Sequence, residues 1–176
     1  VVGMWRARGM DVTLACGSGG AKNLQHTPLC GLPRGAMVAG DHPLADLPAV
    51  SVTARHTHPI VLLDLPLSSD YFLSFFAAAG LKPKIAERTR DMAVMRSLVG
   101  NGFGYAIANV RPLSDLSPDG KKLRFIPLLG QVRSMKLGLL TAKGAGDVLT
   151  VRAFIDHCRG AITPASAPGM NFAKRA

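Results

Sequence analysis

Short apolar runs alternate with segments of helical periodicity along most of the chain. The run from Ile60 to Leu63 is apolar at every position and lies between prolines, a pattern typical of a parallel strand covered on both faces. From Ser68 onward, apolar residues recur at helical spacing until Gly80, where the pattern ends. This stretch therefore predicts a buried strand, a tight turn and a helix.

The same alternation continues on both sides of this stretch. Apolar patterns predict strands over residues 11–16, 34–40, 84–89, 104–110, 123–128 and 135–141, and a weaker extended segment over residues 24–32. Helices are predicted over residues 92–100 and from about 147 to 162. The second helix carries one apolar stripe, made of Val148, Val151, Ile155, Cys158 and Ile162. This order of elements predicts an α/β fold with mostly parallel sheets.

Two weakly patterned segments, near residues 50–58 and 127–133, predict two crossings between two lobes. We expect residues 1–55 and 130–162 to form a partial first lobe, and residues 56–129 to form the second. Residues 163–176 contain two prolines, a glycine and the pair Lys174-Arg175. Such a composition at a chain end predicts a disordered tail.

Composition narrows the class of protein. The 176 residues are 48% hydrophobic, which permits a packed core, yet no apolar run approaches the roughly 18 residues of a membrane span. The first residues lack the order of a secretory signal, because Arg6 and Arg8 interrupt them. We therefore expect a cytoplasmic protein with no membrane partner. The three cysteines form neither a CxxC motif nor a disulfide framework, so we interpret them as plain thiols.

The net charge of +10 suits either a polyanion or a small anionic ligand. The basic residues are scattered, and their two densest groups contain no interleaved aromatic side chains. These groups are Lys82, Lys84, Arg88 and Arg90, and Lys121, Lys122 and Arg124. Solvated basic faces are therefore favoured over a nucleic-acid site.

Catalytic and metal-binding motifs are missing from the sequence. It contains no GxSxG, HExxH or SxxK pattern, and we expect no cofactor, no metal site and no enzyme. His56 and His58 alternate, as a metal pair would in an extended segment, but a linker position is favoured. Asp64 follows the buried strand, where it suits a general base, a ligand acceptor or an acceptor for its own turn.

Several short segments occur in an order that resembles a known family. They are His42-Pro43-Leu44-Ala45, residues 59–66, Ser68-Ser69-Asp70-Tyr71-Phe72, residues 79–83, residues 97–105 and Asn109-Val110-Arg111-Pro112. Together they resemble the effector-binding domain of LysR-type transcriptional regulators over about residues 42–162. The resemblance implies two Rossmann-like lobes of the type 2 periplasmic-binding-protein kind, with the first lobe incomplete, and a small effector bound between them.

The resemblance also implies positions for effector contacts. In the second lobe these are Asp64, Ser68, Ser69, Thr89 and Asn109. Hydroxyl groups and helix N-termini suit a carboxylate or another small anion, although ordinary capping explains Ser68, Ser69 and Thr89 equally well.

In the first lobe, Cys16 and Ser18 follow a predicted strand and are further candidates for effector contacts. By this interpretation the chain is the regulatory, effector-binding domain of a LysR-type regulator, N-terminally truncated because it begins at Val1 without a helix-turn-helix. The full-length form would oligomerise through its first lobe and bind DNA only through the missing N-terminal domain. The alternatives are a free-standing small-molecule-binding protein and an α/β enzyme with Asp64 as its base.

Overall fold

The structure, a computed structural model, describes residues 11–16, 23–53, 57–66, 68–130, 134–163 and 166. The chain forms two compact units, the first within Val1–Leu32 and Ser134–Pro168 and the second containing Pro33–Arg133. Ser18, His56 and most of the expected tail lie outside the described residues, so the interpretations made for them stay predictions. None of the helices described is long and apolar enough to cross a membrane.

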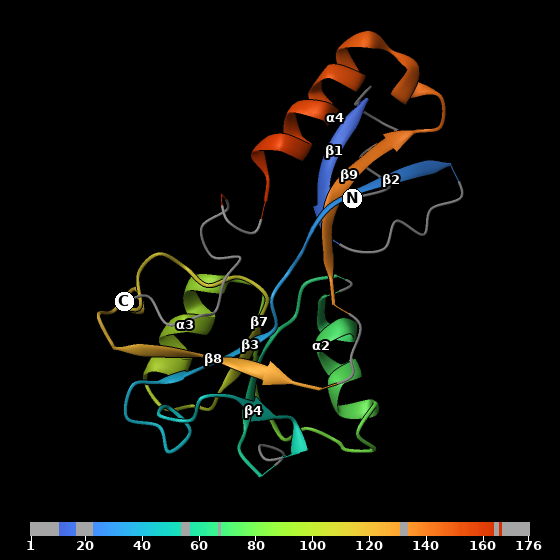
Figure 1. The fold of residues 1–176 in the computed structure, drawn as a ribbon. Coiled ribbons are helices and arrows are strands. Elements are labelled where there is room, and N and C mark those ends of the chain that lie inside the picture. Colours follow the sequence, from blue (N-terminus) through green and yellow to red (C-terminus); the bar gives the residue numbers. More distant parts are fainter. Residues whose placement is uncertain are drawn as a thin grey trace. The chain divides into compact units, whose positions relative to one another are not determined.

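The first unit is a three-stranded antiparallel sheet with one long helix (Figure 1). Its strands are β1 (Val12–Cys16), β2 (Leu24–Gly31) and β9 (Lys136–Ala142), and β9 lies in the middle of the order β1-β9-β2. A short 3-10 helix, η2 (Ala145–Asp147), leads into α4 (Leu149–Ala161). The first unit therefore combines both ends of the chain. Strand β9, from the C-terminal half, lies between β1 and β2, which come from the N-terminal half.

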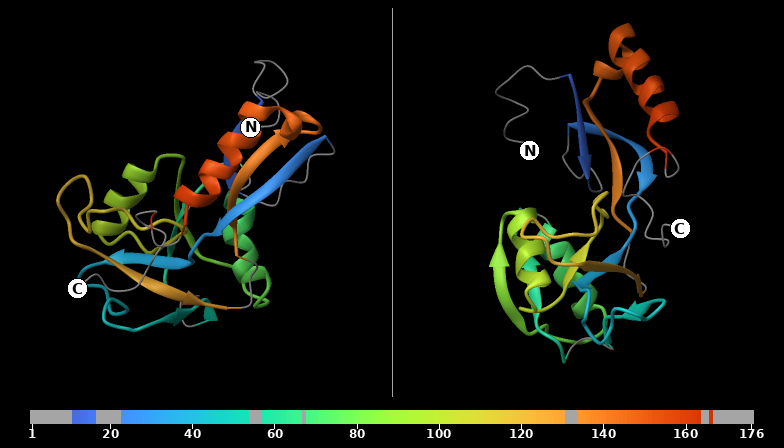
Figure 2. Two further views of the ribbon diagram at one scale, coloured as in Figure 1. Left: turned by 45° about the horizontal axis from the view of Figure 1, so that its top comes forward. Right: turned by 90° about the vertical axis from the view of Figure 1, so that its left-hand side faces the viewer.

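Helix α4 covers one face of this sheet, as the two views of Figure 2 show. Val151, Ile155 and Cys158 recur at helical spacing and pack with Leu139 of β9 in a small buried cluster. Val148, predicted to continue the stripe, is instead the residue before the helix and is about half exposed. The apolar period therefore predicted the buried face of α4 but not its first residue.

The second unit contains the remaining strands and two helices. Its elements are β3 (Gly35–Ala39), β4 (Val50–Ser51), β5 (Ile60–Leu63), α2 (Ser68–Ala77), β6 (Ile85–Thr89), α3 (Met92–Gly100), β7 (Ala106–Ala108) and β8 (Leu123–Leu129). Every strand and helix predicted between residues 34 and 128 is present within a few residues of its expected bounds.

Strand direction in this unit is mixed, so the expectation of mostly parallel sheets was wrong. In the order β4-β8-β3-β7, β3 runs antiparallel to both β7 and β8, and only β4 and β8 are parallel. Strands β5 and β6 form a parallel pair, and a parallel bridge between Ile60 and Tyr105 links β5 to β7. The difference arises at β3, because this strand runs opposite to both of its neighbours, β7 and β8.

The core of the second unit is built around β5. All four of its side chains are buried, because α2 and α3 lie on opposite sides of the central strands (Figure 1). Phe72, Phe75 and Phe76 project from α2 into this core, and Met95 and Val99 project from α3. The continuous apolar run in the sequence therefore corresponds to a strand covered on both faces.

The unit boundaries differ from those expected. The sequence predicted a first lobe of residues 1–55 and 130–162 and a second lobe of residues 56–129. Strands β3 and β4 belong to the same sheet as β7 and β8, so the first crossing follows Leu32. The second crossing, near Arg133, lies within the predicted segment. Hydrogen bonds between strands distant in sequence decide the first boundary, and a hydrophobic pattern carries no information about strand partners.

The N-terminus of α3 is capped by Asp91. The Asp91 carboxylate accepts hydrogen bonds from the backbone N–H groups of Ala93 and Val94, at 2.6 and 3.2 Å. Asp91→Ala is expected to lower the free energy of unfolding by about 1 kcal/mol, because two helical N–H groups lose their acceptor. Urea titration followed by circular dichroism measures this loss, and Asp91→Asn, which keeps the acceptor oxygen, should recover most of it.

Candidate functional site

Three strands of the second unit end side by side and bring three of the predicted residues to one edge. Strands β5, β6 and β7 run parallel, so their carboxyl ends meet at the same edge of the sheet. Asp64 follows β5, Thr89 ends β6 and Asn109 follows β7. The bridge from Ile60 to Tyr105, continued in register, places Asp64 level with Asn109. The carboxyl ends of parallel strands are where open α/β sheets bind ligands.

Asp64 is tied to this edge through its backbone and its carboxylate. Its N–H donates to the carbonyl oxygen of Thr89 at 2.8 Å, which closes the β5–β6 ladder. Its carboxylate lies 3.4 Å from the guanidinium of Arg88, and both side chains remain partly exposed. An exposed pair at this distance contributes little to folding. The edge therefore presents one anionic and one cationic group to solvent.

Thr89 has a structural task at this position. Its hydroxyl accepts from the N–H of Asp91 at 3.1 Å and so fixes the turn that leads into α3. This contact is the capping-type role that the sequence analysis left open for Thr89. A ligand would therefore meet a hydroxyl already held by the backbone.

Ser68 and Ser69 lie in the first turn of α2, and both are half-buried. Their N–H groups donate to the carbonyl oxygen of Leu65, at 3.0 and 3.2 Å. The helix carries Asp70 in the same turn, where a negative charge is favourable. The structure thus places both serines at the positive end of a ten-residue helix that follows β5 directly.

The next strand end combines Asn109 with Arg111. Asn109 is buried, with 8% of its surface exposed. Arg111 is also buried, and its guanidinium forms two hydrogen bonds with the carboxylate of Asp115, at 2.8 and 3.3 Å. It also lies over the ring of Phe125, 5.6 Å from the centroid. Arg111 is therefore held in a structural ion pair.

The two remaining predicted contacts do not belong to the second unit. Cys16 ends β1 in the first unit and is exposed. Ser18 lies outside the described residues. The strand edge of the second unit therefore gathers Asp64, Thr89 and Asn109 and lies next in sequence to the two serines of α2. As effector contacts, all seven residues stay predictions.

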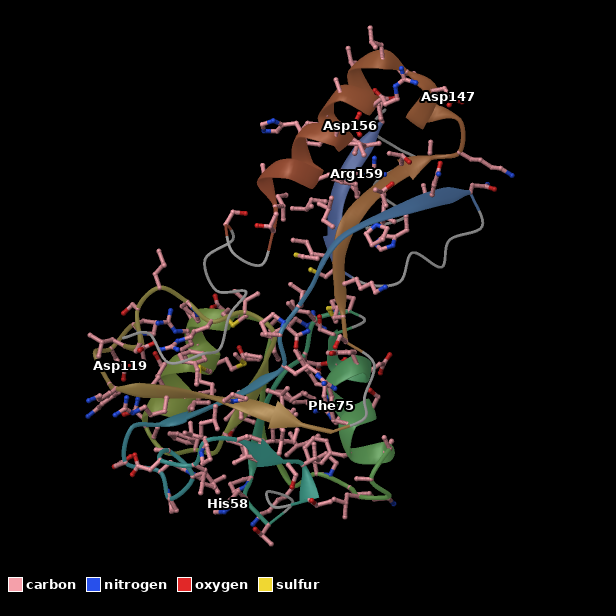
Figure 3. All side chains as sticks on the ribbon, viewed as in Figure 1. His58, Phe75, Asp119, Asp147, Asp156 and Arg159 are labelled. Atoms are coloured by element: carbon pink, nitrogen blue, oxygen red, sulfur yellow. The ribbon has the colours of Figure 1, made fainter. Side chains whose placement is uncertain are left out.

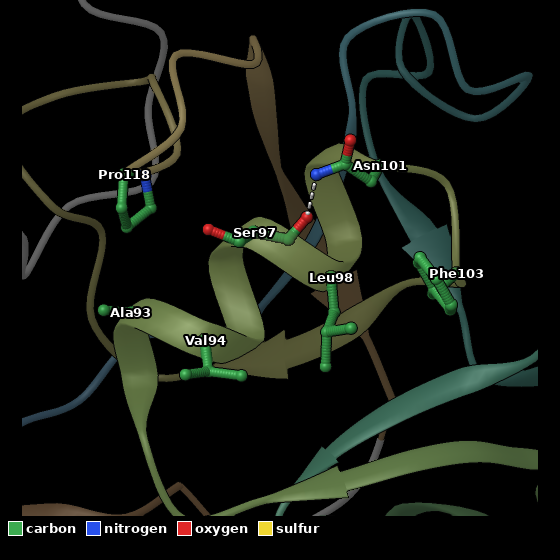
Figure 4. A pocket seen from close by; sticks show the side chains of 7 residues that line it. All are labelled: Ala93, Val94, Ser97, Leu98, Asn101, Phe103 and Pro118. Atoms are coloured by element: carbon green, nitrogen blue, oxygen red, sulfur yellow. Dashed lines mark hydrogen bonds between the residues drawn. The ribbon is translucent and has the colours of Figure 1, made fainter.

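A hollow on the outer face of α3 was not anticipated from the sequence (Figure 4). It has a volume of about 310 Å³ and is lined mainly by apolar groups, namely Ala93, Val94, Ser97, Leu98, Asn101, Phe103 and Pro118. Asn101 donates to the carbonyl oxygen of Ser97 at 2.8 Å and to the Asp119 carboxylate at 2.6 Å. Its mark in the structure is a pair of large apolar side chains that stay about half exposed, Val94 at 47% and Phe103 at 51%.

Asp119 holds the wall of this hollow in place; it is labelled in Figure 3. Its carboxylate accepts from the hydroxyl of Ser117 and from the amide of Asn101, each at 2.6 Å. The Ser117 hydroxyl in turn accepts from the N–H of Lys121 at 2.9 Å. These donors, with Ser117 the strongest, hold the pKa of Asp119 well below its usual range.

This low pKa predicts an acid-dependent stability. A carboxyl whose pKa is lower in the folded state stabilises the fold above its ordinary pKa of about 4, and that contribution is lost as the pH falls toward the folded value. We expect Asp119→Asn to reduce the dependence of the unfolding free energy on pH between about pH 5 and 2. Urea titrations at several pH values test this, with Asp46→Asn as the control; equal slopes for wild type and Asp119→Asn would contradict the assignment.

Within the described residues, no three His, Cys, Asp or Glu side chains are placed to hold a metal ion together. The pair of histidines that the structure does bring together is His42 with His58, whose ring centroids lie 5.0 Å apart. The Nδ1 atom of His42 accepts from the N–H of Leu44 at 3.1 Å, so this nitrogen serves the turn. The arrangement is that of a packed pair beside the start of β5.

Comparison with known proteins identifies the family. The LysR substrate binding domain model matches residues 1–163, and the chain belongs to this family. This confirms the resemblance and the fold expected from it. The type 2 periplasmic-binding-protein-like α/β fold is shared by solved domains such as the effector binding domain of QuiR in complex with shikimate, at 17% identity, a TM-score of 0.75, and coverage of 90% of this chain and 75% of that one.

Two relatives are more similar in sequence. The HTH-type transcriptional regulator TtuA of Agrobacterium vitis is 32% identical over 123 residues, which are 67% of this chain and 38% of that protein. HinK, a LysR family transcriptional regulator of Pseudomonas aeruginosa, is 29% identical with a TM-score of 0.83, over 90% of this chain and 55% of that one. The chain thus spans about two fifths to just over half of these regulators.

Proposed function

We propose that this chain senses a small anionic molecule on behalf of a LysR-type transcriptional regulator. The observation that carries the proposal is the meeting of three parallel strand ends, with Asp64, Thr89 and Asn109, next in sequence to the N-terminus of α2. Membership of the LysR substrate-binding family supplies the class of function. No reaction is required of these residues, so we propose a binding module and not an enzyme.

The anionic character of the ligand follows from the groups at this edge. The first turn of α2 carries two serine hydroxyls at the positive end of the helix, and Arg88 adds a partly exposed positive charge. Asp64 accepts hydrogen bonds and so favours a ligand that also carries a hydroxyl group. The chain as a whole has a net charge of +10, which attracts anions. We therefore propose a hydroxylated carboxylate as the ligand class.

For the whole protein we propose the activity of its relatives. A regulator of this kind carries a DNA-binding domain, assembles as an oligomer and works in the cytoplasm, where its operator lies. Ligand binding then shifts the population of two arrangements of the oligomer on DNA. These statements rest on the family alone.

A thermal-shift screen with small carboxylates tests the ligand class. The probes are the sodium salts of shikimate, citrate, tartrate and benzoate, compared with sodium chloride at the same ionic strength. A ligand present at 100 times its dissociation constant stabilises the folded chain by about 2.7 kcal/mol, which raises the melting temperature by several degrees. If none of these carboxylates raises the melting temperature, the proposed ligand class is contradicted.

Substitutions in α2 locate the binding site. For the carboxylate that gives the largest shift, we expect Ser69→Ala to lower the affinity about tenfold, because a hydrogen bond to a charged group is lost. Ser74→Ala is the matched control. Ser74 lies later in the same helix, and its hydroxyl already donates to the carbonyl oxygen of Tyr71. Calorimetry on the wild type and both variants separates the outcomes. Equal losses in the two variants would place the ligand elsewhere.

A further inference from the structure

The sequence contains a single Asn-Gly pair, Asn101-Gly102, and the structure places it at the end of α3. Asn101 is the residue that follows the helix, and both residues of the pair are exposed. Asparagine followed by glycine is the dipeptide most open to deamidation, because glycine has no side chain to shield its backbone nitrogen. The space beside Gly102 is open, since an added Cβ atom would meet nothing within 4 Å.

The side-chain amide of Asn101 is held by two acceptors. Its Nδ2 atom donates to the carbonyl oxygen of Ser97 at 2.8 Å, the hydrogen bond drawn in Figure 4, and to the carboxylate of Asp119 at 2.6 Å. Asp119 is ionised at neutral pH, since the donors around it hold its pKa well below its usual range. The bond to Asp119 is therefore short and charge-assisted, the stronger kind of hydrogen bond.

The backbone nitrogen that takes part in deamidation is held as well. The N–H of Gly102 donates to the carbonyl oxygen of Val99 at 3.0 Å. Deamidation begins when this nitrogen attacks the side-chain carbonyl carbon of Asn101, so in the folded chain both reacting groups are bound to other partners. The reaction therefore proceeds from conformations in which the end of α3 has opened locally. Its rate is that of a free peptide multiplied by the fraction of chains that are open.

We propose that Asn101 is a site of spontaneous modification by deamidation, which its hydrogen bond to Asp119 holds back in the folded chain. In the reaction, the nitrogen of Gly102 forms a bond to Cγ of Asn101, the Cγ–Nδ2 bond breaks and ammonia leaves. Water then opens the resulting five-membered succinimide ring to aspartate or isoaspartate. Water is the only co-reactant, so no oxidant or reductant takes part.

The product removes the restraint that slowed the reaction. A carboxylate at position 101 would face the carboxylate of Asp119, where the amide nitrogen now lies at 2.6 Å. Two like charges at this separation repel each other, and neither group has a proton to donate. Isoaspartate also adds one atom to the backbone between α3 and β7. Modification should therefore leave this turn open and loosen the wall of the hollow that Asn101 and Pro118 line.

Peptide mapping of the full chain, aged at neutral pH, is the direct test. We expect Asn101 to exchange its amide for a carboxyl group about tenfold or more slowly than in a synthetic peptide of residues 97–105, because a charged hydrogen bond must open first. Fragment spectra distinguish Asn101 from Asn109. Asn23, which is exposed but followed by Leu24, is the internal control and should stay unmodified. Reaction as fast as in the peptide would contradict the restraint, and an unchanged Asn101 would contradict the site.

Asp119→Ala separates the role of the carboxylate from that of the helix. Its removal should speed the deamidation of Asn101 about tenfold, since the amide is released from its charged acceptor. Asp46→Ala changes another exposed carboxylate of the second unit and should leave the rate unchanged. Circular dichroism shows whether each variant is folded, and the comparison of the wild type with the peptide needs no variant. Equal rates in Asp119→Ala and the wild type would overturn the role of Asp119.

Asn101→Asp imitates one product of the reaction without ageing. We expect it to lower the urea midpoint at neutral pH, because two carboxylates then meet at the end of α3. Asn23→Asp adds the same charge at another exposed position and should leave the midpoint unchanged. An Asn101→Asp variant as stable as the wild type would contradict the effect of the product. These measurements use no ligand, so their outcome is independent of the proposed function.

Discussion

Gly104→Ala is expected to destabilise the second unit by about 4 kcal/mol, a large share of the stability of a typical domain. Two causes combine at this position. The backbone has φ near +150°, which side-chain-bearing residues rarely adopt. A Cβ atom would also overlap the carbonyl oxygen of Pro59 and lie 2.9 Å from its carbonyl carbon.

The close approach at Gly104 joins two parts of the sheet. Tyr105 donates to the carbonyl oxygen of Pro59 at 3.0 Å, and Val61 donates to that of Tyr105 at 2.8 Å. These bonds connect β5 to β7, and therefore Asp64 to Asn109. We expect Gly104→Ala to weaken ligand binding as well as folding.

Gly102→Ala separates the two causes. Gly102 also has positive φ, of 82°, but an added Cβ atom meets nothing within 4 Å. Its substitution should cost only about 1 kcal/mol, from backbone strain alone. Urea titration of both variants by circular dichroism makes the comparison. Equal losses in the free energy of unfolding for the two variants would show that the overlap with Pro59 adds nothing to the cost of substituting Gly104.

Phe75→Ala is expected to have a similar effect, a loss of about 4 kcal/mol, through packing. Phe75 lies in α2, is 2% exposed and is labelled in Figure 3. Its ring meets that of Tyr71 edge to face, with centroids 5.1 Å apart. Removing it leaves a cavity, because a close-packed core relaxes only partially around the missing ring.

Phe103→Ala is the matched control for this prediction. Phe103 is 51% exposed and borders the hollow over α3. Its removal takes little apolar surface out of the core, so we expect a change below about 1 kcal/mol. The test is the difference between the urea midpoints of the two variants. If Phe103→Ala loses as much stability as Phe75→Ala, exposure does not govern the cost.

The candidate site shows how far local pattern extends. The family resemblance, together with their places at strand ends, singled out Asp64, Ser68, Ser69, Thr89 and Asn109. The sequence did not show that the hydroxyl of Thr89 serves a turn, or that Arg111 is held by Asp115. Both hydrogen-bond partners lie within four residues in the sequence, but side-chain geometry selects them from several nearby polar groups that the sequence does not distinguish.

By itself, the sequence determined the elements and the family. The apolar run Ile60–Leu63 and the stripe of α4 each follow from spacing within a few residues, and local spacing sets which face of an element is buried. Only the tertiary structure decided the direction of β3 and the boundary after Leu32. Each depends on which strands pair, and pairing joins residues far apart in the sequence, such as Leu24 with Ala142 and Ala36 with Ile126.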